Sequence, residues 1–142
     1  MRKSVLFVLL IVLVACTNKE EKAEEKFRQG IKAIEKNELD KAMTYLNAAI
    51  DYNDKNPEYY FYLGNIHMNK KNFNKAIKKY DQAIAIDSTY YDAWDNKGTV
   101  IFYQTGKREE ACPYWLKAHE LGKKNMRNKI KSCSGFHEGM LR

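Results

Sequence analysis

The sequence predicts an all-α fold, a solenoid of about three helix-turn-helix repeats. The first observation is a set of small residues that recur with a period of 34: Gly30, Gly64 and Gly98, the pair Ala42 and Ala76, and the pair Ala49 and Ala83. The second is that each unit divides into two amphipathic helical segments. A period of this length indicates one supersecondary unit used repeatedly, with each copy burying the apolar face of its neighbour.

Residues 1–15 are expected to be a signal peptide. Arg2 and Lys3 form a short basic start, and the stretch from Val5 to Ala15 is apolar over about 11 residues. A membrane-spanning helix needs about 20 apolar residues, so this length indicates a secretory signal and not a stable membrane helix. An ordinary cleavable signal is one interpretation of this segment.

The end of this segment favours a more specific interpretation. Leu13-Val14-Ala15-Cys16 resembles the lipobox of bacterial lipoproteins, in which the chain is cut before the cysteine. The resemblance implies that Cys16 is lipidated and carries acyl chains such as palmitate, since several chains hold a protein on a membrane far better than one. The alternative is a chance cysteine after an ordinary cleavage site.

Residues 16–22 are expected to form a polar tether between the lipid and the folded domain. Lys19-Glu20-Glu21 in this segment resembles the export tag of some Gram-negative surface lipoproteins. The resemblance implies a lipid-anchored protein of the bacterial cell envelope, at the outer membrane on either its periplasmic or its surface face.

Residues 23–133 are expected to form the repeat domain. A glycine inside a helix costs about 1 kcal/mol relative to alanine, so three glycines at one period indicate sites where helices cross closely. Pro57 is suited to the first turn of a helix and separates the first two units. The third unit holds one extra residue around Thr105-Gly106-Lys107-Arg108, which predicts a longer turn between its two helices.

The repeated positions resemble the tetratricopeptide repeat (TPR) family over roughly residues 23–122. Its motif is W-x2-L-G-x2-Y followed by A-x3-F. The second unit supplies Tyr60, Leu63, Gly64, His67, Ala76 and Tyr80; the third supplies Trp94, Lys97, Gly98, Ile101, Ala111 and Trp115; and the degenerate first supplies Lys26, Gln29, Gly30, Ala33, Ala42 and Leu46. The resemblance implies a solenoid that recognises a protein or peptide on its concave face.

The C-terminal part is expected to close the solenoid. Met126 and Ile130 are four residues apart within 123–133, as in a short capping helix that covers the last repeat. Residues 134–142 are expected to be a loose tail. Cys112 and Cys133 are an even pair in a chain that we expect to be exported, so a disulfide between them is the preferred interpretation, with two buried free thiols as the alternative.

No constellation of catalytic residues is found in the sequence. It lacks nucleophile-elbow, phosphate-loop and zinc-protease motifs, and none of His67, His119 and His137 lies at metal-ligand spacing from another ligand. His67 takes a motif position usually held by tyrosine, so packing is its expected role. We therefore expect a protein that is not an enzyme and has neither a metal nor a cofactor.

The TPR resemblance implies which residues contact a partner, because the first helix of each unit builds the concave face. Carried over position by position, these are Phe27, Ile31, Phe61, Asn65, Met68, Asn69, Asp95, Thr99, Phe102 and Tyr103. The set is largely apolar and aromatic with a few amides, as in a peptide groove. The alternative is that neighbours bury several of them.

One kind of peptide recognition is not expected. TPR domains that clamp a chaperone's C-terminal carboxylate use lysine, asparagine and arginine at positions where this chain has Phe27 and Ile31 in its first unit and Asp92 and Asn96 in its third. The basic clamp is missing.

The chain is basic, with a net charge of +7. Loss of residues 1–15 would leave +5, and the excess lies mainly in Lys70–Lys79 and Lys123–Lys131. Export argues against nucleic acid as a partner. The sequence thus predicts a lipid-anchored adaptor that binds a protein or peptide, and the alternative is a structural envelope component whose basic face contacts peptidoglycan or anionic membrane.

Overall fold

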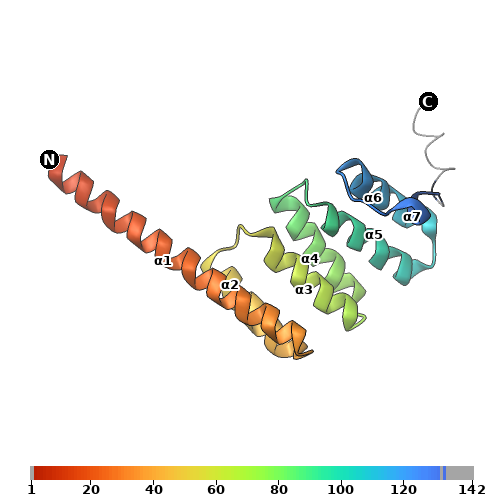
Figure 1. Cartoon of the computed structure of the whole chain (residues 1–142), viewed down its shortest axis with the longest axis horizontal. Coiled ribbons are helices and arrows are strands. Elements are labelled where there is room, and N and C mark those ends of the chain that lie inside the picture. Colours follow the sequence, from red (N-terminus) through yellow and green to blue (C-terminus); the bar gives the residue numbers. More distant parts are fainter. Residues whose placement is uncertain (1, 132, 134–142) are drawn as a thin grey trace. The chain divides into compact units, whose positions relative to one another are not determined.

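The computed structural model describes residues 2–131 and 133, with side chains from Asn18 onward. They form seven helices: α1 (Arg2–Glu35), α2 (Leu39–Tyr52), α3 (Pro57–Asn69), α4 (Phe73–Ile86), α5 (Tyr91–Thr105), α6 (Arg108–Glu120) and α7 (Arg127–Lys131). The described part of the chain contains no strand, so the all-α prediction is confirmed (Figure 1). The chain divides into two compact units, Met1–Tyr59 and Tyr60–Arg142, which are described separately below.

The first unit is built on α1 and α2, which lie side by side (Figure 1). Ala42 and Leu46 of α2 are fully buried, and a Cβ added at Gly30 of α1 would lie 3.1 Å from Cγ of Leu46. Ala23, Ala49 and Tyr59 form a further buried cluster in this unit. The small residues predicted from the period therefore lie where the two helices approach each other.

The segment expected to tether the domain is helical. Residues 16–22 lie within α1, and the side chains of Asn18 to Lys22 are exposed. Ala23, the first residue of the expected repeat domain, is fully buried. Among the residues that the structure describes, no helix has both the length and the apolar character needed to cross a membrane. The expected tail, 134–142, and the side chain of Cys16 lie outside the described residues.

The second unit stacks α3 on α4 and α5 on α6. A Cβ added at Gly64 would lie 2.5 Å from Cε1 of the buried Tyr80, and one added at Gly98 would lie 2.8 Å from Cδ1 of Trp115. Both distances are below normal van der Waals contact. The close crossing predicted at these two glycines is therefore confirmed, and an aromatic ring from the second helix fills each crossing.

The turns inside the first two repeats have the same backbone form. Asn37 and Lys71, again 34 residues apart, have φ angles of 58° and 57°. The amide of the residue after each of them donates to a carbonyl five residues back, from Glu38 to Ala33 and from Asn72 to His67. This is the Schellman arrangement, which satisfies the last carbonyls of a helix.

The longer turn expected in the third repeat is absent, so that prediction is wrong. Helix α5 has 15 residues where α3 has 13, and only Gly106 and Lys107 separate it from α6. Gly106 adopts a left-handed φ of 71° and its amide donates to the carbonyl of Phe102. Gly106, which ends the helix, follows Thr105, so the extra residue of the third repeat lies within α5 and not in the turn.

The C-terminal core of the second unit joins α6 to α7. Sγ of Cys112 on α6 and Sγ of Cys133 just after α7 are bonded 1.99 Å apart, the pair expected from the sequence. Trp115 and Met126 are buried beside this disulfide. The five-residue α7 falls within the capping segment predicted over 123–133.

Candidate partner-binding face

The four α3 residues implied to contact a partner share one side of that helix. Phe61, Asn65 and Met68 follow each other at spacings of four and three, which places them in one row. These three side chains are half-buried, and Asn69, next to the row, is exposed. We call Phe61, Asn65, Met68 and Asn69 the α3 row.

A hydrogen-bond network holds the amide of Asn65 in one orientation. Its Oδ1 accepts a hydrogen bond of 2.8 Å from the hydroxyl of Tyr80 on α4 and another of 2.8 Å from Nδ2 of Asn96 on α5. The Tyr80 hydroxyl also lies 3.9 Å from Sδ of Met68. Burial raises the pKa of Tyr80, so its hydroxyl stays protonated and remains a donor.

The same network leaves one polar group of Asn65 available. With both donors directed at Oδ1, the Nδ2 group points away from Tyr80 and Asn96. Among the described residues, none accepts a hydrogen bond from it. A fixed amide with two free N–H donors suits the carbonyl oxygens of an extended peptide.

Phe61 belongs to an aromatic cluster. Its ring centroid lies 5.2 Å from that of Tyr90, 5.5 Å from that of Tyr62 and 6.1 Å from that of Tyr80. Such offset and edge contacts stabilise the fold by themselves. Phe61 therefore packs the second unit from the face where a partner was expected, and its truncation would affect folding as well as binding.

Two of the implied contact residues on α5 are engaged by the chain's own cap. Asp95 is only 7% exposed, and Nζ of Lys129 on α7 donates to its Oδ1. The same ammonium donates to Oγ1 of Thr99 at 3.0 Å, while Nζ of Lys123 lies 3.6 Å from Oδ2 of Asp95. A partner would reach Asp95 and Thr99 only by displacing Lys129.

The other two α5 positions differ from each other. Phe102 is half-buried, with its ring centroid 5.9 Å from that of Trp115 and the guanidinium of Arg108 5.2 Å above the ring. Tyr103 is 61% exposed, the most exposed large hydrophobic side chain of the described residues. It lies 34 residues after Asn69, so the exposed members of the two sets occupy equivalent places on α3 and α5.

The first unit contributes Phe27 and Ile31, both half-buried. The ring centroid of Phe27 lies 5.0 Å from that of Tyr59, against the cluster that contains Ala23 and Ala49. Packing accounts for Phe27. Among the implied contact residues, the amides of Asn65 and Asn69 and the exposed Tyr103 are therefore available to a partner. Several of the other side chains also form the core.

Some residues that shape this face were missed by sequence reasoning. Tyr80 and Asn96 orient Asn65, and Lys129 covers Asp95. The period itself held a signal for Lys129, which stands 34 residues after Asp95 and so takes the place of a partner-contact position in a further repeat. The Asn65–Asn96 contact had no such signal, since the two residues are 31 apart.

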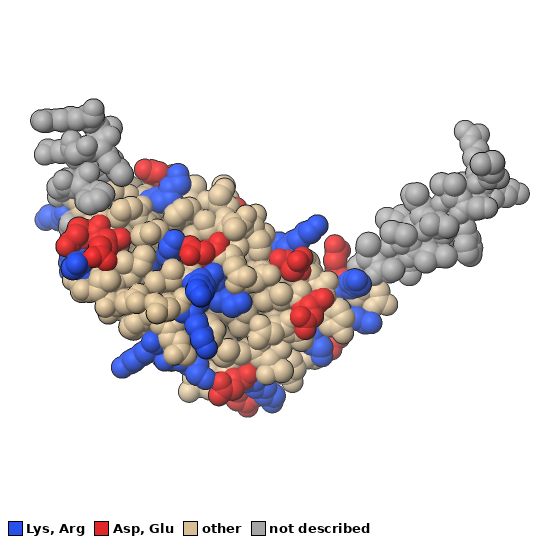
Figure 2. All heavy atoms as spheres, turned by 180° about the vertical axis from the view of Figure 1, so that it is seen from behind, with Lys and Arg blue, Asp and Glu red and all other residues tan. Residues whose placement is uncertain are grey.

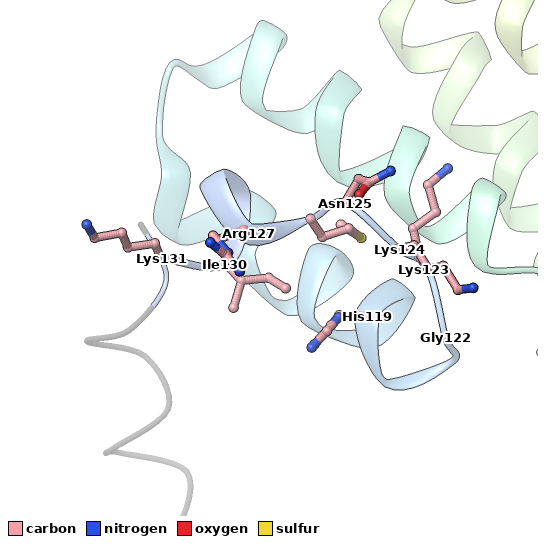
Figure 3. A pocket seen from close by; sticks show the side chains of 9 residues that line it. His119, Gly122, Lys123, Lys124, Asn125, Arg127, Ile130 and Lys131 are labelled. Carbon is pink, nitrogen blue, oxygen red and sulfur yellow. The ribbon is translucent and has the colours of Figure 1, made fainter.

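Basic residues surround a second feature of this unit, a pocket between α6 and α7 with a volume of about 700 Å³. Figure 3 shows His119 on α6 and Arg127, Ile130 and Lys131 on α7 around it. Lys123 and Lys124, in the loop before α7, also line the pocket, although Lys123 is paired with Asp92. Figure 2 shows one face of the molecule, on which Lys and Arg gather in clusters between scattered Asp and Glu.

In the described part of the chain, no group of three or more His, Cys, Asp or Glu side chains lies close enough to hold a metal ion. The titratable groups near the α3 row include the phenols of Tyr62, Tyr80 and Tyr90 and, on another side of α3, the imidazole of His67. The chemistry that the row offers a partner is therefore amide hydrogen bonding and apolar contact.

Comparison with known proteins supports the repeat assignment. Residues 57–90 match the model described as "Tetratricopeptide repeat" and residues 33–71 match one described as "TPR repeat". A yeast (Saccharomyces cerevisiae) protein, small glutamine-rich tetratricopeptide repeat-containing protein 2, is 29% identical over 110 residues, which are 78% of this chain. The aligned part is 32% of the yeast protein, so this chain spans about a third of that relative.

Solved structures show the same arrangement of helices. The TPR domain of Arabidopsis OM64 superposes with a TM-score of 0.74 at 22% identity, covering 83% of this chain and 98% of that domain. The first TPR domain of Spaghetti (RPAP3), solved bound to an HSP90 peptide, gives 0.73 at 20% identity, covering 87% and 96%. The described helices therefore have the fold of a tetratricopeptide-repeat solenoid, and residues 33–90 match the repeat itself by sequence.

Proposed function

We propose that this chain is a non-catalytic adaptor that binds a protein or peptide through the α3 row and Tyr103. The observation that carries the proposal is the amide of Asn65, whose oxygen is fixed by Tyr80 and Asn96 and whose Nδ2 donors are free. The exposed Asn69 and Tyr103 extend this surface with hydrogen-bonding and aromatic groups, the residue types enriched in recognition surfaces.

The likeness to a TPR domain bound to an HSP90 peptide supports peptide binding as the mode. The means of recognition must differ from a carboxylate clamp. The clamp positions hold Phe27, Ile31, Asp92 and Asn96, and Asp92 is already paired with Lys123. We infer that a partner is held along its main chain and by apolar side chains, with no requirement for a free C-terminus.

The proposal includes a place in the cell. Cys16, in its lipobox-like context, is the lipidation site of a chain anchored in a bacterial envelope, at the outer membrane. The exposed helical turns at Asn18–Lys22 then separate the anchor from the first buried residue, Ala23. Replacing Cys16 by serine should leave an uncleaved or soluble chain. A variant that fractionates with membranes at its normal processed size would refute the anchor.

The experiment that tests the adaptor is crosslinking capture from intact envelopes, with the captured partner identified in wild type and then quantified in variants. Asn65→Ala and Tyr103→Ala should each reduce capture at least about tenfold, because central aromatic and hydrogen-bonding contacts commonly contribute 1.4 kcal/mol or more. Tyr52→Ala removes another exposed tyrosine, from α2, and should leave capture unchanged. Equal capture by all three variants would refute this surface.

A second function is favoured by one observation, the basic pocket between α6 and α7 (Figure 3). Lys124, Arg127 and Lys131 around it would attract peptidoglycan or an anionic membrane, making the chain a structural envelope component. Salt separates the two functions. An apolar and amide surface keeps its partner at high salt, whereas a basic pocket loses an anionic polymer.

A further inference from the structure

A second pocket of the same unit lies between α3 and α4 and is separate from the α3 row. It has a volume of about 430 Å³ and is lined by His67, Lys75, Lys78, Lys79, Asp81 and Gln82. We call it the α3–α4 pocket. His67 follows Asn65 by two residues and therefore lies on the opposite side of α3. A ligand here would not compete directly with a partner on the α3 row.

His67, one of the residues that line this pocket, has a buried polar atom without a hydrogen-bond partner among the described residues. The side chain is only 7% exposed, and its Nδ1 is buried without a hydrogen-bond partner among the described residues. Buried polar atoms are nearly always paired, so an orphan in a well-packed helix pair calls for an explanation. Packing alone does not explain the unpaired nitrogen. The tyrosine that is usual at this motif position would fill the same space and leave no nitrogen unpaired.

The pocket carries positive charge without a matching acid. Lys75, Lys78 and Lys79 line it, and among the described residues none forms an ion pair with them. The one acidic lining residue, Asp81, is bonded through Oδ1 to Nζ of Lys97 at 2.6 Å. The Lys79 ammonium lies 5.4 Å from the centre of the Tyr60 ring, which holds it at the pocket.

The charges affect each other as a set. Burial lowers the pKa of His67, and Lys75, Lys79 and Lys70 lower it further. Burial also lowers the pKa of Lys79. Each of these groups becomes easier to charge when an anion lies among them, so binding of an anion and protonation of the pocket reinforce each other.

We propose that the α3–α4 pocket binds a phosphate group, carried either by a soluble phosphate compound or by a lipid headgroup. Three lysine ammoniums are compact point charges, which suit a phosphate with its charge of about −1.5 to −2 better than a carboxylate with a single charge. A turn of the His67 ring toward the lysines would let its buried Nδ1 donate to a phosphate oxygen. The proposal rests on neither of the two functions proposed above.

The test is a titration of the purified protein with sodium phosphate, following the imidazole signals of His67 by NMR in a buffer without other multivalent anions. A saturable shift of His67 is expected, and sulfate, a dianion of the same shape, should produce it as well. Acetate should bind at least about tenfold more weakly because it carries one charge. Equal binding of acetate and phosphate would overturn the assignment to phosphate.

Variants show whether the effect belongs to the pocket. Lys75→Gln with Lys78→Gln should weaken phosphate binding at least about tenfold. The matched control is Lys32→Gln with Lys36→Gln, which removes the same charge from exposed sites at the end of α1 and in the turn after it, and should leave binding unchanged. His67→Tyr restores the usual motif residue, so it should fold and, when followed by the backbone amide signals of α4, bind phosphate less tightly. Absence of a saturable shift, or equal weakening by both double variants, would overturn the proposal.

Vesicles then separate the two sources of the phosphate. If a lipid headgroup is bound, more of the protein should sediment with vesicles containing phosphatidic acid than with pure phosphatidylcholine vesicles, and Lys75→Gln with Lys78→Gln should remove this difference. If the ligand is soluble, free phosphate binds and the double variant changes vesicle binding no more than the Lys32 and Lys36 control. Either pattern supports the pocket, provided that free phosphate shifts His67.

Discussion

The hydroxyl of Tyr80 donates a 2.8 Å hydrogen bond to Oδ1 of Asn65 across the crossing of α3 and α4. The ring of the same tyrosine fills the space beside Gly64, where an added Cβ would lie 2.5 Å from Cε1. One residue therefore does two things: its ring closes the helix pair and its hydroxyl fixes an amide of the α3 row, on the candidate partner-binding face. The close packing of the repeat and the orientation of the Asn65 amide are coupled.

The first prediction separates these two roles. Tyr80→Phe keeps the ring and removes the hydroxyl, so Asn65 retains only the hydrogen bond from Asn96. The free energy of unfolding should fall by about 1 kcal/mol, the usual net value of one hydrogen bond. Partner capture should fall more clearly than stability, because the amide is free to turn. Urea unfolding beside quantitative capture measures both, and capture equal to wild type would contradict the orienting role.

The second prediction concerns Gly64 and Gly30. Gly64→Ala gains about 1 kcal/mol of helix propensity but forces a Cβ into the Tyr80 ring, which is buried and held by Asn65, so a net loss of about 1–2 kcal/mol is expected. Gly30→Ala meets Cγ and Cδ2 of Leu46 at 3.1 and 3.2 Å, where a flexible side chain can shift. It should change stability by less than about 0.5 kcal/mol. Thermal and urea unfolding of both variants test the contrast, which equal losses would contradict.

The third prediction concerns the contact of the cap with α5. Lys129→Met removes the ammonium that binds Asp95 and Thr99 and leaves the buried carboxylate with Lys123 alone. The loss should be about 1–3 kcal/mol, typical of a hydrogen bond to a charged buried group. Lys124→Met, at an exposed lysine of the same loop and cap, should cost less than about 0.5 kcal/mol.

A double-mutant cycle confirms the partner of Lys129. Asp95→Asn should cost less in the Lys129→Met background than in wild type, because the charge that needs compensation is gone. Strictly additive effects in urea unfolding would show that Lys129 stabilises the cap by some other contact.

The fourth prediction concerns the disulfide. Cys112→Ala with Cys133→Ala opens a link across a sequence separation of 21, worth roughly 3 kcal/mol in the chain-entropy model. Amide hydrogen exchange should speed up in α7 and around Trp115, which packs in the same core as both cysteines. Reductant should destabilise the wild type and leave the double variant unchanged. A wild type indifferent to reductant would contradict the role of the link.

The fifth prediction concerns pH and His67. Burial and three nearby lysines lower its pKa below the ordinary value of 6.5, so near that pH the unfolded chain binds more protons than the folded chain. The contribution of His67 to stability is therefore complete above about pH 6.5, falls as the pH drops through that value, and levels off below the folded pKa. Urea unfolding in buffers without phosphate should show this fall.

His67→Tyr isolates the contribution, since His119 and His137 remain in both proteins. The difference in free energy of unfolding between wild type and variant should shift in favour of the variant as the pH falls. A difference that is independent of pH would show that His67 titrates normally.

Much of the fold could be predicted because each repeat is defined by residues that are close together in the sequence. The period of 34 located Gly64 and Gly98 at close crossings, and the structure places buried rings of Tyr80 and Trp115 against them. The pairing of Cys112 with Cys133 was also expected. The length of α5 was not expected. A helix ends where the backbone hydrogen-bond pattern changes, and here the left-handed residue that ends it, Gly106, comes only after Thr105.

Less of the candidate site could be predicted. Position in the repeat, carried over from the TPR resemblance, marked Asn65, Asp95 and Phe61 as expected partner contacts. It could not show that the amide of Asn65 keeps free donors, or that Lys129 covers the carboxylate of Asp95. Nor could it show that the ring of Phe61 packs among Tyr62, Tyr80 and Tyr90. Apart from Tyr62, which adjoins Phe61, the residues that decide these outcomes lie 15 to 34 positions away, and their contacts depend on how side chains of neighbouring helices pack.

The sequence by itself therefore determined the class of fold, the repeat unit and its small-residue crossings, since each follows from spacing along the chain. The set of expected partner contacts came from the TPR resemblance and stays a prediction. Only the tertiary structure decided which of those positions are free. Lys129 meets Asp95, and Asn96 meets Asn65, through side chains of adjacent helices, and their contacts depend on rotamers and on packing. The tertiary structure also decided the state of His67. The repeat motif assigned this residue to packing, and only the surrounding helix pair shows that its Nδ1 has no hydrogen-bond partner among the described residues.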